Sequence, residues 1–330
     1  MTPDVSVLLP FRDAAETLAE ALDSILAESD VRLEVLAVDD GSTDGSAAIA
    51  RRFGAPVRVL EGGGRGIAHA LELARGQARA PFLARMDADD VGLPGRLAAQ
   101  LDLLTRAPEL AVVGGRVEAF GEGVGEGWLR YVAWQNGLLT AAEHLRDRFV
   151  EATLCHPSTM LRAAALVSVG GWRDGDFAED WDLWLRLHAA GFGLAKVERT
   201  VLRWRHRAGR ATFTDARYGE EAHRALRARH LAPVLHAQST RRLTMWGAGP
   251  VARRLARELE GHGLRFARFV DIDPRRVGGV CRGAPIIEPA ALSGDDFVVV
   301  AVGARGARAE IRAHLLGRGY REPHDFVCAA

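Results

Sequence analysis

The sequence predicts an α/β fold in which a mostly parallel sheet is covered by helices on both faces. Between Val5 and Ala84, apolar runs of strand length alternate with polar loops and amphipathic stretches. Units of this length favour parallel strands joined by crossover helices. A shorter series of the same kind begins at Leu243. The 330 residues are therefore expected to form two domains, at 1–235 and 240–330.

The composition limits the class of protein. Lys and Arg together number 43, as do Asp and Glu, and hydrophobic residues make up 48%. This balance predicts a globular protein that is not a nucleic-acid binder. Three widely spaced cysteines favour neither a disulfide framework nor a zinc site. Because a basic leader and a membrane-length apolar run are both lacking, we expect a cytoplasmic protein. Peripheral association at the inner face of a membrane stays open.

The first β–α unit begins at the apolar run Val5–Leu9, which Pro10 is expected to end. Asp13 stands where an N-cap is expected and has Glu16 three residues on, as in a capping box. The apolar residues between Leu18 and Leu26 then fall on one face of a helix.

The pattern repeats along the next part of the chain. Further strands are predicted at Leu33–Val38, Val57–Leu60 and Ala80–Ala84, with helices at Ser46–Phe53 and Ile67–Ala74 between them. The loops behind the strands carry Phe11 and Arg12, Asp39 to Ser42, the glycines around Arg65, and Asp87 to Asp90. Because ligands bind at the carboxyl ends of parallel strands, these loops are expected to share one crevice.

The stretch from Asp87 to Asp90 is the centre of that crevice. Asp87 and Asp89 are two residues apart, so on an extended backbone both side chains leave the same face and can share a hard cation. An isolated Asp-x-Asp is more often a solvated turn. With carboxylates on a second strand end, a glycine loop and a guanidinium nearby, the set suits a nucleoside diphosphate held by a divalent metal.

Four motifs resemble a known family in order and spacing. They are Val5–Pro10, Val38–Asp44, Ala84–Asp90 and Glu179–Leu187. Together they resemble family 2 glycosyltransferases of the GT-A fold, over roughly the first two-thirds of the chain. The resemblance implies transfer of a sugar from a nucleotide donor, typically UDP-linked, to a glycan or lipid-linked acceptor.

The resemblance also implies roles for individual residues. Asp40, with Asp39 beside it, contacts the donor's base, Asp87 lies near the ribose, and Asp89 binds Mg or Mn. Further donor contacts are implied at Pro10, Phe11, Arg12, Arg65 and Arg205. The helix after Gly66 is about one turn shorter than in relatives and lacks their Asn. The role of Arg65 is therefore open between a donor contact and a solvated loop residue.

The general base implied by the resemblance is Asp180, with Glu179 beside it. Displacement with inversion needs a group that accepts the proton of the acceptor hydroxyl. Glu179 and Asp180 open a predicted helix that stops at Gly191, so Asp180 faces whatever precedes that helix. The alternative is that Asp180 only caps the helix.

The acceptor side is less well defined. His156, in a His-Pro-Ser segment like the family's, either lines the acceptor pocket or is a buried structural histidine. Trp181 is placed on the same side, and the aromatic residues from Trp128 to Trp134 form either a rim or part of the core. Past the base helix, an Arg-rich loop runs through Arg210. There His206 is a candidate metal ligand and Arg205 a candidate diphosphate contact; a solvated loop is the alternative.

The second domain begins with a strand and a glycine turn. Gly247 and Gly249 belong to a G-x-G-x-x-A turn after a strand, and Asp271 follows about 20 residues later, as in a dinucleotide fingerprint. The module is similar to small Rossmann-like domains appended to sugar-modifying acetyltransferases and methyltransferases. Because it has no lysine, a Tyr-x-x-x-Lys redox pair is excluded. An NAD-like nucleotide, a partner, or no ligand at all remain the alternatives.

Two other functions would share features of this sequence. A sugar-1-phosphate nucleotidyltransferase would need a Gly-rich basic loop near the N-terminus, and Leu9-Pro10-Phe11-Arg12 does not provide one. A non-catalytic protein that binds a nucleotide sugar or NAD through a decayed transferase domain stays open. The sequence does not specify the sugar, the acceptor or the oligomeric state.

Overall fold

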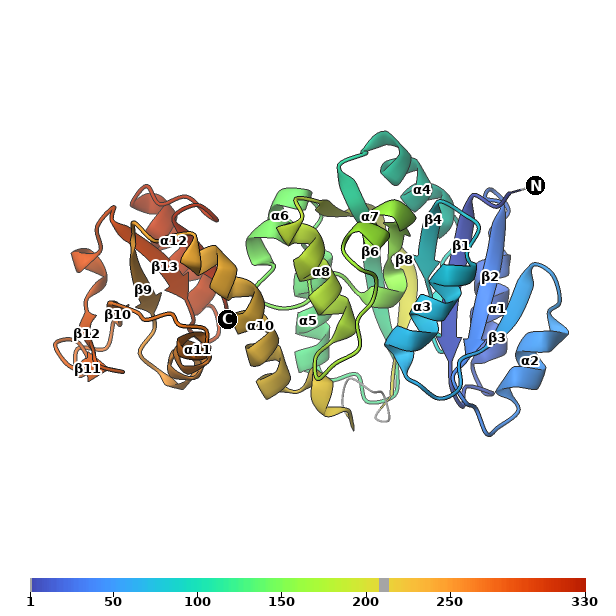
Figure 1. The fold of residues 1–330 in the computed structure, drawn as a ribbon, viewed down its shortest axis with the longest axis horizontal. Coiled ribbons are helices and arrows are strands. Elements are labelled where there is room, and N and C mark those ends of the chain that lie inside the picture. The colour runs from blue at the N-terminus through green and yellow to red at the C-terminus, as the bar shows by residue number, and fades with distance from the viewer. Residues whose placement is uncertain (1, 208–213) are drawn as a thin grey trace. The chain divides into compact units, whose positions relative to one another are not determined.

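The computed structural model describes residues 2–207 and 214–330, which belong to two compact α/β units (Figure 1). The units comprise Met1–His144 with Thr153–Asp215, and Leu145–Ala152 with Ala216–Ala330. Helix α10 (Glu220–His236) belongs to the second unit. The sequence places the predicted domain boundary behind this helix, between 235 and 240.

The first unit is built on an eight-stranded sheet with the order β3-β2-β1-β4-β7-β6-β8-β5. Its strands are β1 (Val5–Phe11), β2 (Leu33–Asp39), β3 (Val57–Glu61), β4 (Phe82–Arg85), β5 (Val91–Gly92), β6 (Leu110–Gly121), β7 (Met160–Arg162) and β8 (Gly193–His206). Its helices include α1 (Leu18–Leu26), α2 (Ser46–Arg52), α3 (Ile67–Gln77), α4 (Arg96–Arg106), α5 (Glu126–Asn136), α7 (Ala163–Ser168) and α8 (Glu179–Ala189). Helix α6 (Ala141–Asp147) spans the division between the units. The prediction of a mostly parallel sheet covered by helices is confirmed.

The parallel half of this sheet follows from the apolar runs in the sequence. Strands β3, β2, β1 and β4 lie side by side and are all parallel (Figure 1). Every residue of β1 is buried, as expected for a strand covered on both faces. The strand does not end at Pro10 but continues to Phe11, with Pro10 in register with Val38.

Asp13 does not cap the first helix. Helix α1 begins at Leu18, and its N-cap residue is Thr17. The backbone of Asp13 adopts the left-handed conformation, with φ 48°. Its carboxylate instead accepts the amide of Thr43 at 2.7 Å. Asp13 therefore ties the loop after β1 to the loop after β2, which explains why an acid stands there.

The second unit contains a six-stranded sheet with the order β11-β12-β10-β9-β13-β14. Its strands are β9 (Arg242–Trp246), β10 (Arg268–Val270), β11 (Val280–Cys281), β12 (Ala284–Ile287), β13 (Asp296–Val300) and β14 (Phe326–Cys328). All neighbours are parallel except β11, which pairs antiparallel with β12. Helices α11 (Pro250–Gly261) and α12 (Ala307–Gly317) connect strands of this sheet.

The segment Leu231–Thr240, around the domain boundary that the sequence predicts, is largely helical. Helix α10 continues to His236 although Pro233 lies inside it. Leu231, Ala232 and Leu235 are 0%, 3% and 1% exposed. Burying this apolar face stabilises the last turns of the helix enough to outweigh the hydrogen bond that proline removes.

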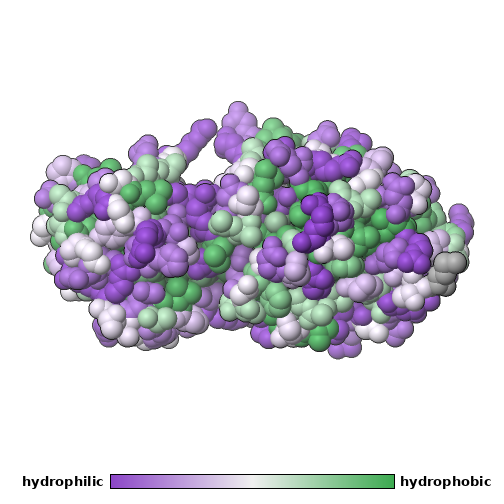
Figure 2. All heavy atoms as spheres, turned by 90° about the horizontal axis from the view of Figure 1, so that it is seen from above, coloured by the Kyte–Doolittle hydropathy of each residue, from purple (hydrophilic) through white to green (hydrophobic). Residues whose placement is uncertain are grey.

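Among residues 2–207 and 214–330, none of the helices is long and apolar enough to cross a membrane. The face drawn in Figure 2 mixes hydrophilic and hydrophobic residues in small groups.

Candidate active site

The loops at the carboxyl ends of the parallel strands are bonded to one another. The amide of Asp40 donates to the carbonyl of Phe11 at 2.8 Å, and the amide of Gly62 donates to the carbonyl of Asp39 at 2.7 Å. These bonds join the loops after β1, β2 and β3. Neighbouring β4 carries the acidic stretch at the same edge. The adjacency of strand ends that the sequence predicts is thus present.

Asp40 organises the glycine loop that follows β3. Its two carboxylate oxygens accept the amides of Arg65 and Gly66, at 2.8 and 2.9 Å. Asp40 is 6% exposed, and Asp39 accepts the amide of Ser42 at 2.8 Å. Gly41 has φ 82°, and a Cβ there would lie 3.2 Å from Gly64 Cα. These bonds fix the glycine loop close against the loop after β2.

The other residues implied as donor contacts lie around this loop. Pro10 and Phe11 are buried, whereas Arg12 is exposed and its Nε lies 3.9 Å from the carboxylate of Asp13. The side chain of Arg65 is exposed.

The acidic stretch after β4 turns rather than staying extended. The amide of Asp90 donates to the carbonyl of Asp87 at 3.4 Å, so the shared-face argument for Asp87 and Asp89 is wrong. The turn nevertheless gathers Asp87, Asp89 and Asp90. One carboxylate oxygen of each lies within 4.8 Å of the others. Three hard oxygen ligands at this spacing fit a divalent cation such as Mg²⁺ or Mn²⁺.

Arginines surround the three carboxylates. Arg85 forms an ion pair with Asp87, and Arg207 contacts Asp89 at 3.1 Å. The amide of Arg205 donates to Asp90 Oδ1 at 2.8 Å, and its Nε donates to the carbonyl of Asp89 at 2.6 Å. The guanidinium of Arg205 therefore holds the backbone of the acidic turn. Arg210 lies outside the described residues.

Arg85 is the buried counter-charge of the cluster, and it is 2% exposed. Burial alone would lower the pKa of its guanidinium, but the carboxylates of Asp87, Glu179 and Asp90 outweigh that effect and raise the pKa. Arg85 therefore stays charged and connects the acidic turn electrostatically to Glu179 at the start of α8.

Arg96 is a second buried arginine, and it bonds the backbone next to the acidic turn. It is 0% exposed and donates to the carbonyls of Arg85 at 2.6 Å and Pro157 at 2.8 Å. Burial lowers the pKa of Arg96 to about 10, which still leaves it charged at neutral pH. This guanidinium ties the end of β4 to the segment around His156.

Helix α8 begins at Glu179, as predicted, with Ala178 as its N-cap residue. Asp180 is therefore inside the first turn and is not the cap, although its Oδ1 accepts the amide of Trp181 at 2.7 Å. Asp180 is partly exposed, whereas Glu179 is 3% exposed. The two neighbouring acids thus differ in access: the side chain of Asp180 meets solvent, and that of Glu179 is buried.

His156 is buried in a hydrogen-bonded position. The indole Nε1 of Trp172 donates to His156 Nε2 at 3.1 Å, and His156 Nδ1 lies 3.5 Å from Glu179 Oε1. This network assigns the ring proton to Nδ1. Burial, and next the charge of Arg85, lower the pKa of His156 and keep the ring neutral. Of the two interpretations that the sequence left open, the geometry favours the structural histidine that orients Glu179.

Two further residues are not placed as the sequence suggested. Trp181 is 1% exposed, so it lies on the buried face of α8 and offers no surface to an acceptor. The imidazole of His206 bonds the carbonyl of Glu122 at 2.8 Å and lies edge-on to Trp128, with ring centroids 5.5 Å apart. His206 is not part of the cluster of three carboxylates.

The aromatic residues of α5 are half-buried and stack on β8. Trp128 lies 4.5 Å from Trp204 between ring centroids, and Tyr131 lies 5.6 Å from Trp128. They pack against the core of the first unit with part of each ring exposed. Of the two interpretations of these aromatic residues, packing in the core therefore explains the buried part of each ring.

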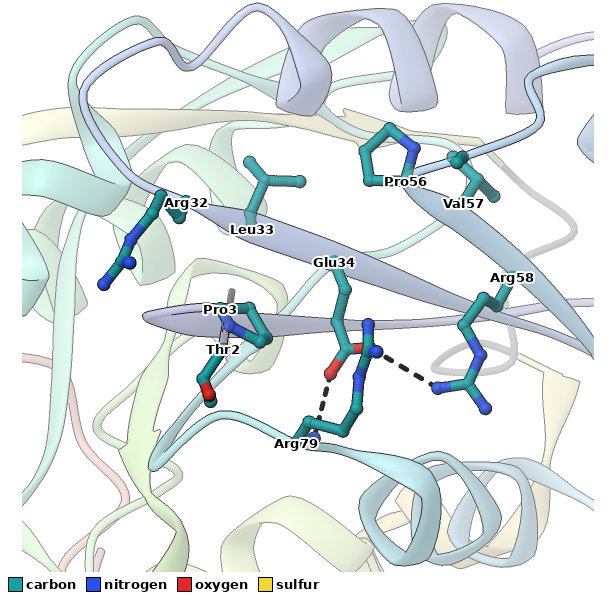
Figure 3. Close-up of a pocket in the computed structure, with 10 residues that line it drawn as sticks. Thr2, Pro3, Arg32, Leu33, Glu34, Pro56, Val57, Arg58 and Arg79 are labelled. Atoms are coloured by element: carbon teal, nitrogen blue, oxygen red, sulfur yellow. Dashed lines mark hydrogen bonds and ion pairs between the residues drawn. The ribbon is translucent and has the colours of Figure 1, made fainter.

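A hollow of about 350 Å³ lies at the opposite, amino-terminal edge of the same sheet (Figure 3). Glu34 projects into it and is held by Arg79 Nε at 2.8 Å, Arg58 Nη1 at 3.4 Å and the hydroxyl of Ser6 at 2.7 Å. Burial would raise the pKa of Glu34, but these bonds outweigh it and lower the pKa. Because the carboxylate of Glu34 is already paired with these residues, we interpret this hollow as structural: it joins the starts of neighbouring strands.

The sequence reasoning missed three functional candidates: Arg85, Arg96 and Arg207. An arginine at the end of an apolar run and directly before acids can be recognised in the sequence, and this pattern could have singled out Arg85. Nothing in the sequence distinguishes Arg96 from a solvated helix residue. Arg207 is one of several arginines in its segment, and only its contact with Asp89 singles it out.

The family model Glycosyl transferase family 2 matches residues 6–170. The chain is also similar to the putative glycosyltransferase EpsE of Bacillus subtilis (strain 168), with 30% identity over 199 residues, which cover 58% of this chain and 68% of EpsE. This chain belongs to glycosyl transferase family 2. The glycosyltransferase is likewise similar to the UDP-Gal:alpha-D-GlcNAc-diphosphoundecaprenol beta-1,3-galactosyltransferase of Escherichia coli, with 24% identity over 61% of this chain and 74% of that protein. Other relatives are named for succinoglycan and amylovoran biosynthesis.

Solved structures show the same fold. S. aureus TarS 1-349 in complex with UDP-GlcNAc matches with a TM-score of 0.57 and 17% identity, over 78% of this chain and 72% of that chain. The mannosyltransferase PcManGT from Pyrobaculum calidifontis, in complex with GDP-Man and Mn2+, matches with a TM-score of 0.51 and 21% identity, over 79% and 70%. The glycosyltransferase therefore has the GT-A fold expected from its motifs.

The candidate residues of the second unit also gather at strand ends. Gly247 and Gly249 follow β9, and Asp271 follows the neighbouring strand β10. Asp271 Oδ2 accepts the amide of Ala248 at 3.2 Å.

Proposed function

We propose that this glycosyltransferase moves a sugar from a nucleoside-diphosphate donor to a hydroxyl acceptor, with a divalent cation and with inversion at the anomeric carbon. The observation that carries the proposal is the cluster of Asp87, Asp89 and Asp90, joined through Arg85 to the start of α8. Family membership supplies the reaction class, and the cluster supplies a position for the donor diphosphate.

The carboxylates fit a divalent cation by number, spacing and chemistry. Asp89 would hold it, with Asp87 and Asp90 beside it. When bound, such a cation supplies a Lewis acid for the leaving diphosphate, typically worth several kcal/mol. The arginines at Asp87 and Asp89 balance the carboxylates in the structure described here. Mn2+ in the PcManGT complex supports this assignment.

The donor side is proposed to follow the loops after β1, β2 and β3. Asp39 and Asp40 would face the base, with Pro10, Phe11, Arg12 and Arg65 around them, and Asp87 would lie toward the ribose. Asp40 holds the amides of Arg65 and Gly66, so this loop is already fixed in shape. UDP is the proposed nucleotide, because TarS binds UDP-GlcNAc and the Escherichia coli relative is named for UDP-Gal.

Asp180 is proposed as the general base. It is partly exposed in the first turn of α8, where the helix dipole favours a charged carboxylate. The buried Glu179, between Arg85 and His156, would orient that turn without touching substrate. Proton transfer to a positioned carboxylate typically contributes about 10²- to 10⁴-fold in rate. A single base acting on the acceptor hydroxyl is what inversion requires.

The acceptor is proposed to be a hydroxyl of a glycan or of a lipid-linked precursor. The Escherichia coli relative is named for a diphosphoundecaprenol-linked acceptor, and two others for polysaccharide biosynthesis. The corresponding location would be the cytoplasmic face of a membrane. We also propose that the chain comprises a transferase domain at 1–235 and a Rossmann-like domain at 240–330, supported by the parallel order of strands β12-β10-β9-β13-β14.

The direct test measures release of nucleoside diphosphate from a panel of UDP- and GDP-sugars with Mn²⁺, Mg²⁺ or EDTA. The proposal expects release with at least one donor that depends on metal and rises when an acceptor sugar is added. Full release in EDTA would reject the cation. No release from any donor, with nucleotide binding retained, would favour the non-catalytic binding protein.

A further inference from the structure

The second unit contains a hollow that the proposed transfer reaction does not use. It has a volume of about 520 Å³ and lies at the carboxyl ends of β9, β10 and β13. Chain order reverses between β9 and β13, because β10 lies on one side of β9 and β13 on the other. In open parallel sheets this reversal is where ligands bind. The volume is within the range of small-molecule sites.

The glycine turn after β9 leaves room where a side chain would otherwise stand. Gly249 has φ −83° and ψ −176°, an extended conformation that any residue adopts, also before a proline. A Cβ at this position would meet only Arg276 Nη1, at 3.7 Å. Glycine is therefore not required by the backbone here, and its missing side chain opens the hollow. Gly247 differs, because its φ is 122° and a Cβ would lie 2.8 Å from the carbonyl of Ala301.

Asp271 supplies a carboxylate to the wall of this hollow. Its oxygens accept the amides of Ala248 and Asp273, at 3.2 and 3.0 Å, and the guanidinium of Arg276 at 3.0 Å. A carboxylate has roughly four acceptor positions, so these three bonds leave one for a ligand hydroxyl. The side chain is 11% exposed, and the bonds fix its orientation.

Apolar and basic groups line most of the rest of the hollow, which also includes the acidic Glu310. Ile272 and Val251 are 77% and 37% exposed although both line it, so two apolar side chains meet water where a flat ring can cover them. Arg276 and Arg305 add positive charge to the wall. A fixed carboxylate, an apolar surface and guanidinium groups match a ribose, a base and phosphates, respectively.

We propose that this hollow binds a ribonucleoside diphosphate moiety, with Asp271 on the ribose 2′-hydroxyl and Gly249 beside the phosphates. Dinucleotides such as NAD and nucleotide sugars both carry this moiety. The site is independent of the transfer chemistry, because all its lining residues belong to the second unit and none of them is a proposed metal ligand.

Isothermal titration calorimetry of the full chain in EDTA tests the proposal, because the cation needed for the donor site is then absent. The probes are ADP-ribose, NAD, NADP and UDP-GlcNAc. We expect one binding event per chain with ADP-ribose. At least one of NAD and UDP-GlcNAc should also give one binding event per chain. NADP should bind at least about tenfold more weakly than NAD, because a 2′-phosphate would stand against the Asp271 carboxylate.

Three variants locate the binding event. Gly249→Leu should abolish it, and Asp271→Asn should weaken it by about ten- to a hundredfold, as for a lost hydrogen bond to a charged group. Asp295→Asn, at an exposed acid of the second unit outside the hollow, should leave it within about twofold, a change of under 0.5 kcal/mol. Thermal unfolding of each variant checks that the second unit remains folded.

Two results would overturn the proposal. One is the lack of heat with all four probes at millimolar concentration. The other is binding that survives in Gly249→Leu and disappears in Asp89→Asn, which would place the ligand in the donor site. Neither result affects the metal-dependent release assay, so failure here and failure of the transferase proposal can be told apart.

Discussion

Two parallel sheets in this chain each place an acid at the end of a strand, but the surroundings of the two acids differ. After β4, three carboxylates gather within 4.8 Å and are faced by two arginines. After β10, Asp271 accepts two amides and the guanidinium of Arg276. The first site gathers three carboxylates beside arginines, and the second has a single carboxylate bonded to two amides and one guanidinium.

This difference separates two ways of holding a nucleotide. A cluster of carboxylates suits a cation that bridges to phosphate, whereas a single carboxylate with one acceptor position left suits a hydroxyl. The glycines differ in the same sense. Around Gly41 and Gly64 they let two loops pack together, whereas at Gly249 the missing side chain leaves space. We therefore propose that the same strand-end position serves as a metal-dependent clamp in one unit and as a metal-independent pocket in the other.

The largest effect is expected from Asp180→Asn, which tests whether chemistry belongs to the first site alone. Loss of the base should lower kcat by about 10²- to 10⁴-fold. Donor affinity should stay unchanged, because Asp180 is proposed to face the acceptor. Steady-state kinetics and donor titration measure the two quantities. Asp176→Asn, the same charge change on the exposed loop before α8, is the matched control. Turnover retained in Asp180→Asn would reject this base.

A smaller effect is expected at the opposite edge of the first sheet, from Glu34→Gln. Its partners Arg58 and Arg79 are 39% and 60% exposed, so the loss should be about 1–2 kcal/mol of unfolding free energy. Transfer activity should not change. Because the pKa of Glu34 is lowered on folding, its contribution is present above pH of about 4.5 and is lost as the pH falls through the lower folded value.

Denaturant unfolding between pH 7 and pH 3 measures this contribution. The difference between wild type and Glu34→Gln should shrink as the pH falls. Glu61→Gln, which removes an exposed ion pair with Arg51, should cost less at every pH. A loss of donor binding in Glu34→Gln would show that the two edges of the sheet are coupled, contrary to the structural interpretation.

The smallest effect is expected from Arg207→Gln, which removes a guanidinium that competes with the cation for the carboxylate of Asp89. The guanidinium is 41% exposed, so the pair is worth at most about 1 kcal/mol. Without nucleotide, Mn²⁺ should bind up to about fivefold more tightly to the variant. Arg199→Gln, which changes an exposed arginine on the preceding strand β8, should leave affinity unchanged. Weaker Mn²⁺ binding in Arg207→Gln would instead make this arginine a support of the site.

The sequence predicts the parallel half of the fold well, because runs such as Leu33–Val38 are buried on both faces and carry their own signal. It predicts that Asp39, Asp40 and Asp87 to Asp90 lie at the same edge of the sheet, because they follow the two strands that flank β1. The short strands β5 and β7 are set by pairing with distant partners, and no local pattern marks them. The same holds for the helical Leu231–Leu235, whose burial outweighs a local proline signal.

Side-chain partners are harder to predict than strand ends. The extended-backbone argument for Asp87 and Asp89 fails, yet the turn brings Asp90 into the cluster as well. Arg96 reaches the carbonyls of Arg85 and Pro157 across 11 and 61 residues of sequence. Such contacts depend on tertiary placement and leave no periodic signature. The burial of Trp181 is likewise decided by how α8 packs.

We propose above all that Asp89, with Asp87 and Asp90 beside it, holds a divalent cation, and that Asp271 does not. Titration of Mn²⁺ followed by electron paramagnetic resonance, with and without UDP, tests it directly. We predict one Mn²⁺ per chain, bound more tightly with UDP and lost in Asp89→Asn. Binding should be kept in Asp271→Asn and in Asp102→Asn, an exposed acid paired with Arg106 on α4. Wild-type Mn²⁺ affinity in Asp89→Asn would contradict the account.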